Sequence, residues 1–259
     1  IVERGEPLWF SNLAPKPVDP EADGTPLFIA AIAKLQPLSV AFENRLGGNP
    51  GADPVLATDL DANREALELL RGALGRPHFR LSLDFETDRP QTIRLQPIQY
   101  ARTFGRLLDG ELLYAIGCDD HPRAVRAVED MYALSEMIRD EPFEITQMVR
   151  FAISANAWYT LKTLVGHVDL TNQEFTGLDD RFATMERAWT LVPAVLAKRA
   201  TMFTEMSHIT RDYINEYLND QGKKDEPVPN RAWESFWYRP LLMGDQLFTL
   251  TKLGKWAEL

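Results

Sequence analysis

The sequence predicts a mostly α-helical fold of stacked helix hairpins, forming an α-superhelix or tetratricopeptide-like array. Two observations support this prediction. Between residues 95 and 188, apolar residues recur at spacings of three and four, the period of an amphipathic helix. Very short breaks at 117–122 and 140–142 separate three such stretches, which is typical of consecutive helices that pack side by side. The sequence contains no recognisable catalytic or cofactor motif, so we expect a shape suited to binding.

Composition and charge are those of an acidic globular protein. The chain has 259 residues, a net charge of −10, and 45% hydrophobic and 25% charged residues, which is ordinary for a domain with a sizeable core. Its basic residues form no cluster suited to a phosphate backbone, so we expect no nucleic-acid partner. Cys118 is the only cysteine, which excludes an internal disulfide. The most apolar stretch, 145–166, contains Arg150 and Lys162 and is too interrupted to span a bilayer.

Residues 1–24 are predicted to form a proline-rich extended arm, and residues 25–259 a single helical domain. Four prolines in the arm remove backbone donors and fix φ, which disfavours a helix. Leu8, Trp9 and Phe10 are large apolar side chains in this segment. Left in water, each would forgo roughly 1.5–3 kcal/mol of burial. We therefore expect them to pack on helices of their own chain or of a neighbouring one.

Two helices are expected before residue 78. Thr25 followed by proline matches an N-cap with proline at the first helical position, and predicts a helix that runs to about Arg45. Asp59 or Asp61 is expected to start a second helix, which glycine and proline end at 75–77.

Between residues 78 and 95 the apolar pattern changes from helical to alternating. The apolar members of this alternation are Phe79, Leu81, Leu83 and Phe85, and the residues between them are polar, which indicates extended chain. We expect either a short hairpin or an extended segment that lies along the helices.

The helical pattern resumes at Pro97. The stretch 143–165 is apolar on nearly every side, so we expect it in a central position, with Ala152 and Ala155 packed against neighbouring helices. The tetrapeptide at 171–174 has the spacing of a capping box, which predicts the start of the next helix.

A long helix is predicted over 193–218, and it carries the sharpest candidate for chemistry. Glu205, His208 and Asp212 follow at steps of three and four and therefore share one face. A Glu-x-x-His step occurs in di-iron helical bundles, but those sites need two copies and two further glutamates. Only one copy is present here, so these residues are weak candidates for metal ligands. We assign no catalytic residue and expect no cofactor.

Aromatic residues gather in a final amphipathic segment at 231–259. Trp233, Trp237, Tyr238 and Arg239 lie close together there, and Trp, Tyr and Arg are favoured at binding hot spots. Core packing is the simpler interpretation, but adjacent helix positions cannot all face one core. These four residues are therefore a candidate binding site for a peptide or glycan.

Short structural motifs lie at 5–8, 23–28, 107–127, 133–149 and 239–242, among them Asp-Gly-Thr-Pro-Leu-Phe before the first helix and Asp-Glu-Pro at 140–142. In these motifs the chain resembles an uncharacterised, planctomycete-type family of membrane-anchored helical proteins. The Asp-Gly pair at 23–24 departs from the acidic pair that the family often has there. The shared motifs are structural, so the resemblance implies a tetratricopeptide-like fold and carries over no functional residue.

The resemblance also implies a membrane anchor ahead of residue 1, which agrees with the missing initiator methionine, and an extracytoplasmic location. The leading hypothesis is a non-enzymatic interaction or scaffold domain, the soluble part of a membrane-anchored protein. We expect a protein or peptide partner, and membrane contact through the anchor alone. The alternatives are a helical metal-dependent enzyme that uses Glu205, His208 and Asp212, and an aromatic-lined peptide- or glycan-binding module.

Overall fold

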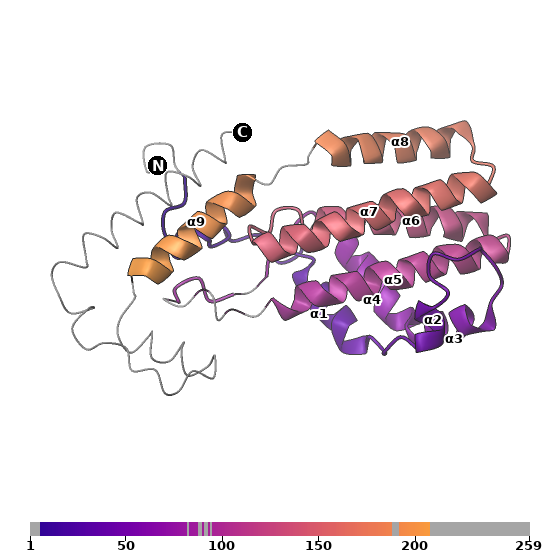
Figure 1. Cartoon of the computed structure of the whole chain (residues 1–259), viewed down its shortest axis with the longest axis horizontal. Coiled ribbons are helices and arrows are strands. Elements are labelled where there is room, and N and C mark those ends of the chain that lie inside the picture. The colour runs from indigo at the N-terminus through magenta and orange to yellow at the C-terminus, as the bar shows by residue number, and fades with distance from the viewer. Residues whose placement is uncertain are drawn as a thin grey trace, which may run out of the picture.

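A computed structural model of the chain describes residues 6–81, 83–87, 90, 93, 95–187 and 192–207 (Figure 1). Of these described residues, 69% are helical and none belongs to a β-strand. The all-α prediction is therefore confirmed for this part of the chain. Its elements are a short 3-10 helix, η2 (Phe10–Leu13), and the α-helices α1 (Thr25–Lys34), α2 (Val40–Glu43), α3 (Pro54–Ala62), α4 (Arg64–Leu74), α5 (Gln96–Gly117), α6 (His121–Met137), α7 (Glu144–His167), α8 (Asn172–Arg187) and α9 (Val192–Ser207).

Three long helices, α5, α6 and α7, pack side by side (Figure 1). The short helices pack on one side of them, with α1 against α4 and α3 against α5, while α8 packs against α6 and α9 against α7 and η2. One continuous core cluster joins these layers, from Phe28 on α1 through Leu108 on α5 and Met131 on α6 to Phe182 on α8. The result is the array of packed helices that the short connections predict.

The first predicted helix is shorter than expected. α1 ends at Lys34, before Pro37, which has no backbone N–H to continue a helix. The chain becomes helical again as α2, which the side chain of Ser39 caps. Thr25 is not the N-cap but the first residue of α1, and its hydroxyl bonds the backbone of Arg80. The predicted end near Arg45 was therefore wrong because the proline interrupts the apolar pattern.

The second helical region begins earlier than predicted. α3 starts at Pro54, where the side chain of Asp53 accepts a hydrogen bond from the Val55 N–H at 2.8 Å. Proline suits this position because the first helical N–H needs no partner. Asp59, one of the two expected starts, lies inside α3 and accepts a 2.7 Å bond from the hydroxyl of Ser39. A local break then separates α3 from α4.

The described residues of the segment 78–95 form no hairpin. They make a single β-bridge, between His78 and Asp23. The buried apolar side chains of the segment are Phe79, Leu81 and Phe85. The segment therefore lies extended along the helices, which was the second of the two expected arrangements.

The N-terminal arm docks on its own chain. Phe10 is buried, and its ring stacks on that of Phe85 with the centroids 5.3 Å apart. The Phe10 N–H donates to the hydroxyl of Thr204 on α9 at 2.8 Å. Arg199, also on α9, is fully buried and pairs with Glu6 at 2.8 Å. The apolar start of the arm thus packs on α9 and on the extended segment, as internal docking predicts.

The capping box before α8 is confirmed. The Thr171 N–H donates to Glu174 Oε2 at 2.8 Å, and the Glu174 N–H donates to Thr171 Oγ1 at 3.3 Å. α9 begins at Val192, close to the predicted start, and is described as far as Ser207. The predicted end of this helix at 218 and the final segment 231–259 lie outside the described residues.

The expected central position of α7 is wrong. In the described part of the chain, α7 packs on α5, α6 and α9, while Ala152 and Ala155 on its outward side are exposed. The reason is that α7 carries polar residues on the side that faces the interior, and its apolar residues are distributed around the whole helix.

Candidate interaction surface

α7 turns polar side chains inward and large apolar side chains outward. The buried polar residues on α7 are Thr146, Gln147, Arg150, Ser154 and Thr160, each at most 5% exposed. The exposed large apolar residues are Ile145, Met148, Phe151, Trp158, Tyr159 and Val165, each at least 43% exposed. The interior side also holds Val149, Ile153, Ala157 and Leu164. A helix at the surface of a globular protein ordinarily has the opposite distribution of polar and apolar residues.

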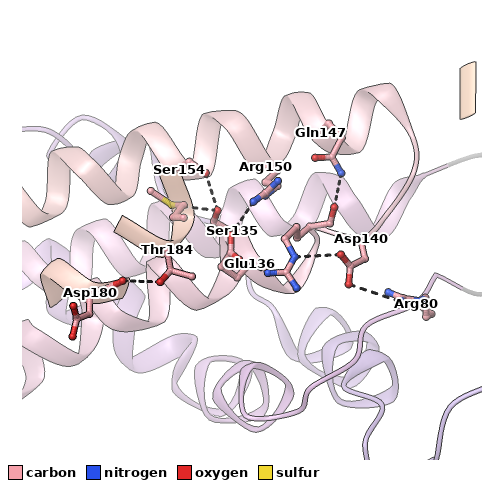
Figure 2. Close-up of polar contacts among 11 residues, drawn as sticks. Arg80, Ser135, Glu136, Asp140, Gln147, Arg150, Ser154, Asp180 and Thr184 are labelled. Atoms are coloured by element: carbon pink, nitrogen blue, oxygen red, sulfur yellow. Dashed lines mark hydrogen bonds and ion pairs between the residues drawn. The ribbon is translucent and has the colours of Figure 1, made fainter. Parts of the chain in front are cut away.

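Hydrogen bonds to α6 hold α7 in this orientation (Figure 2). The hydroxyls of Ser135 on α6 and Ser154 on α7 lie 2.7 Å apart. Arg150 on α7 donates to Glu136 on α6 at 2.9 Å. A rotation of α7 that buried its outward side would leave these groups without partners, at roughly 1–3 kcal/mol each. The outward position of the apolar side chains is therefore a specified feature of the fold.

The beginning of α7 is fixed in the same way. Gln147 donates to the backbone carbonyls of Arg139 and Glu141, at 2.9 and 2.7 Å, in the turn between α6 and α7. The carboxylate of Glu141 is itself buried and accepts a 2.9 Å bond from the Leu81 N–H. Burial raises the pKa of Glu141, and the bond from Leu81 offsets part of that shift. Hydrogen bonds thus connect the α6–α7 turn both to the extended segment and to α7.

We call the outward side of α7 the α7 surface, and define it by the exposed residues Ile145, Met148, Ala152, Ala155, Tyr159 and Lys162. Steps of three and four place these residues on one side of the helix, over a length of about 25 Å. Met148 is 65% exposed. Trp158 lies beside this surface, and its ring meets that of Phe182 on α8 at 4.8 Å between centroids. The α7 surface is therefore a largely apolar strip on a fixed helix.

The loop before α3 is hydrogen-bonded to Tyr159 of the α7 surface. The Tyr159 hydroxyl donates to the Gly47 carbonyl at 3.1 Å, and Gly47 has a φ of 68°, which favours glycine. The backbone of Gly47 also bonds the carboxylate of Asp109 on α5, a residue that is 8% exposed. Burial raises the pKa of Asp109 to about 6, and the bond from Gly47 opposes the shift. Tyr159, the loop and α5 are thereby joined in one chain of contacts.

An arginine-lined cavity of about 540 Å³ lies between α4, α5 and α6. On its wall, Arg71 pairs with Glu111 at 2.5 Å and with Asp130 at 2.7 Å. Arg123 pairs with the other oxygen of Glu111 at 2.9 Å. The guanidinium groups of Arg71 and Arg123 are thus bonded to carboxylates on neighbouring helices, and they brace α4, α5 and α6 against one another.

A smaller cavity of about 250 Å³ lies beside the α6–α7 turn. Arg139 on its wall pairs with Glu136 at 3.0 Å and with Asp140 at 3.2 Å. Arg80 approaches Asp140 at 3.9 Å (Figure 2). These charges again pair with one another, so the cavity is better explained as part of the turn's structure than as a ligand site.

The candidate site residues predicted from the sequence fall beyond what the structure describes. Glu205 belongs to α9, but its side chain is not among those described. The other predicted residues, namely His208, Asp212, Trp233, Trp237, Tyr238 and Arg239, lie outside the described residues. Within the described ranges, no three His, Cys, Asp or Glu residues are grouped so that they could hold a metal ion. None of the helices described there is both long and apolar enough to cross a membrane.

The sequence reasoning missed the α7 surface, although a signal for it was present. The all-round apolar character of 143–165 was interpreted as complete burial. Thr146, Arg150, Ser154 and Thr160 nevertheless follow at steps that place them on one side of a helix. Polar residues gathered on one side of an apolar helix indicate that this side has polar partners, and here those partners are on α6.

No protein family model, no curated protein and no solved structure matches this chain. The described residues form an all-α array of packed helices in which a largely apolar side of α7 faces outward.

Proposed function

We propose that this chain is a non-enzymatic interaction domain, a tetratricopeptide-like scaffold that binds a protein or peptide partner on the α7 surface. One observation carries the proposal: α7 keeps polar groups inside through hydrogen bonds such as Arg150 to Glu136, while Met148 and Tyr159 are exposed. Apolar patches of this kind on a folded protein typically mark interaction sites.

The residue types on the α7 surface suit recognition. Tyr159, with Trp158 beside it, belongs to the residue types that dominate binding hot spots. Met148 has a flexible thioether that adapts to partners of different shape. Full burial of one large apolar side chain is worth roughly 1.5–3 kcal/mol, and about half of that remains to be gained where half the side chain is exposed. A hydrogen bond between Ser154 and Ser135 and one from Tyr159 to Gly47 hold the helix and the ring in place, so less ordering free energy opposes binding.

The resemblance to membrane-anchored helical proteins extends this proposal. An anchor ahead of residue 1 would hold the helical array beside a membrane, and the α7 surface would then act on partners at that membrane. The hypothesis is supported by the motifs at 23–28 and 133–149 and by the fold class that they imply.

Photocrosslinking from the α7 surface tests the proposed function. A photoreactive amino acid is placed at Ala155 in the protein expressed in its own cells, and at Ala62 on α3, which is also exposed, as a control. We expect a defined protein adduct from position 155 and none of the same mass from position 62. Equal patterns from the two positions, or no adduct from position 155, would contradict the proposal.

A further inference from the structure

We infer that the partner that occupies the α7 surface is a second copy of this chain, bound about a twofold axis so that the two α7 helices run antiparallel. The inference rests on the proposed function, because it names the partner of the same surface. It is drawn from the order of side-chain sizes and charges along that surface.

Side-chain size along the α7 surface reads the same in both directions. Met148, Ala152, Ala155 and Tyr159 follow as large, small, small and large, at steps of four, three and four. In an antiparallel pair centred between the two alanines, Ala152 lies opposite Ala155 of the second copy. Met148 then lies opposite Tyr159 of the second copy, and the same contacts recur on the other side of the axis. A twofold interface requires such self-complementarity.

The alanines determine how closely the helices approach. Interaxial distances between packed helices are about 8–10 Å and depend on the side chains at the contact. Both alanines are exposed and have small side chains, so the two helix axes can lie close together at the crossing point. At either side of it, the thioether of Met148 meets the ring of Tyr159, a favourable sulfur–aromatic pairing.

Charge favours the antiparallel direction. Glu144 stands at the beginning of α7 with its side chain 63% exposed, and Lys162 stands exposed near the end. An antiparallel pair brings Lys162 of each copy toward Glu144 of the other, whereas a parallel pair would bring like charges together. Among the described residues, Glu144 makes one long ion pair, at 3.8 Å with Lys198. The pairing therefore adds opposite charges at both ends of the contact.

The size of the contact predicts a reversible dimer. α7 between Ile145 and Lys162 is about 25 Å long and a helix is about 10 Å across. A strip of this size on each copy amounts to about 500 Å² in total, which is well below the roughly 1,200 Å² at which standard protein interfaces begin. The dimer should therefore dissociate on dilution.

Sedimentation equilibrium tests the dimer. We expect the parent chain to approach twice the 29.5 kDa mass of one chain as its concentration rises. Ala152→Glu and Ala155→Glu should keep the mass of one chain at the same concentrations, because each would bury a charge at the crossing point. Ala62→Glu, at an exposed position at the end of α3, should behave as the parent. Because Ala152 and Ala155 are exposed, both variants should keep the circular dichroism spectrum of the parent.

Disulfide mapping tests the direction of the helices. In a Cys118→Ser background, which removes the exposed native thiol, Met148→Cys chains are mixed with Tyr159→Cys chains and oxidised. In an antiparallel pair, Met148→Cys chains should form disulfides with Tyr159→Cys chains. Met148→Cys chains alone should not crosslink, because their two thiols would lie about 16 Å apart along the helix. A disulfide needs Cα atoms within about 7 Å.

The outcomes separate this inference from the proposed function. A parent chain that remains monomeric overturns the inference, even where position 155 still captures a different protein and the proposed function stands. Crosslinking of Met148→Cys with itself overturns the antiparallel arrangement. A dimer that Ala155→Glu leaves intact also overturns the inference, because the contact must then lie elsewhere.

Discussion

Arg71 is the residue on which the packing of three helices depends. Its guanidinium bonds the carboxylates of Glu111 and Asp130, and the side chain of Glu111 is 3% exposed. Removing one partner of a buried pair leaves an unpaired charge, which costs about 3–5 kcal/mol. Loss of one member of this charge network should therefore destabilise the fold, although the net contribution of the network to stability, relative to apolar packing, is small.

We predict that Arg71→Met lowers the free energy of unfolding by about 3 kcal/mol. The matched control is Arg64→Met, because Arg64 and its partner Asp61 are 69% and 70% exposed. An exposed pair contributes little, so the control should lie within about 0.5–1 kcal/mol of the parent. Urea unfolding measures both differences, and equal losses in the two variants would contradict the role of Arg71.

The buried carboxyl group of Asp109 should make the stability of the folded protein depend on pH. Its pKa is raised from 3.8 to about 6 in the folded protein because it is buried. Between these two values the folded state binds more protons than the unfolded state, so this group lowers stability as pH rises from about 4 to about 6. Above pH 6 the loss is constant, at about 2–3 kcal/mol.

Asp109→Asn should therefore stabilise the protein at pH 7 by up to about 2–3 kcal/mol, because the amide carries no charge to bury and can still accept the bond from Gly47. The advantage should shrink as pH falls through 6 toward 4. Urea unfolding of parent and variant at pH 7 and pH 4.5 measures it. A difference that is the same at both pH values would show that Asp109 does not titrate in this range.

At the scale of elements, the arm docks on the rest of the chain through the side chain of Phe10. Phe10 is 1% exposed and packs against Phe85 and Phe143, whereas the neighbouring Trp9 is 41% exposed and touches Phe203 by its edge. These two aromatic residues are therefore adjacent in the arm but differ in burial.

We predict that Phe10→Ala lowers the free energy of unfolding by about 3 kcal/mol, because it leaves a cavity between the arm and its neighbours. Trp9→Ala is the internal control and should cost about 1 kcal/mol, as the lost contact is largely at the surface. Thermal unfolding followed by circular dichroism compares them. If Trp9→Ala proves the more damaging, the arm docks through a different side chain.

Sequence periodicity predicted which elements exist better than where they begin. The helical stretches after 95 and the capping box at 171–174 were predicted because each depends on local pattern. The start of α3 was missed because Asp53 followed by proline competes with Asp59, and only the fold shows that Asp59 bonds Ser39. The break after Lys34 follows from Pro37, a local signal to which the helix prediction gave too little weight.

At the scale of the whole molecule, the position of α7 could not be predicted from its composition. An apolar helix can be central, or it can lie at the surface with one side open to another molecule, and overall hydrophobicity is the same in both cases. The distinction depends on partners distant in sequence, such as Ser135 for Ser154 and Gly47 for Tyr159. The predicted metal-ligand and aromatic sites lie outside the described residues and stay predictions.

The central claim is that another protein covers the α7 surface when the protein works, and the oxidation of Met148 by peroxide tests it most directly. Met148 is 65% exposed in the single chain, and Met131, fully buried on α6, is an internal control. Exposed methionines oxidise readily and buried ones slowly. We predict that Met148 is protected in intact cells and oxidises rapidly in purified, dilute protein, while Met131 stays protected in both. Equal oxidation of Met148 in cells and in dilute solution would contradict the claim.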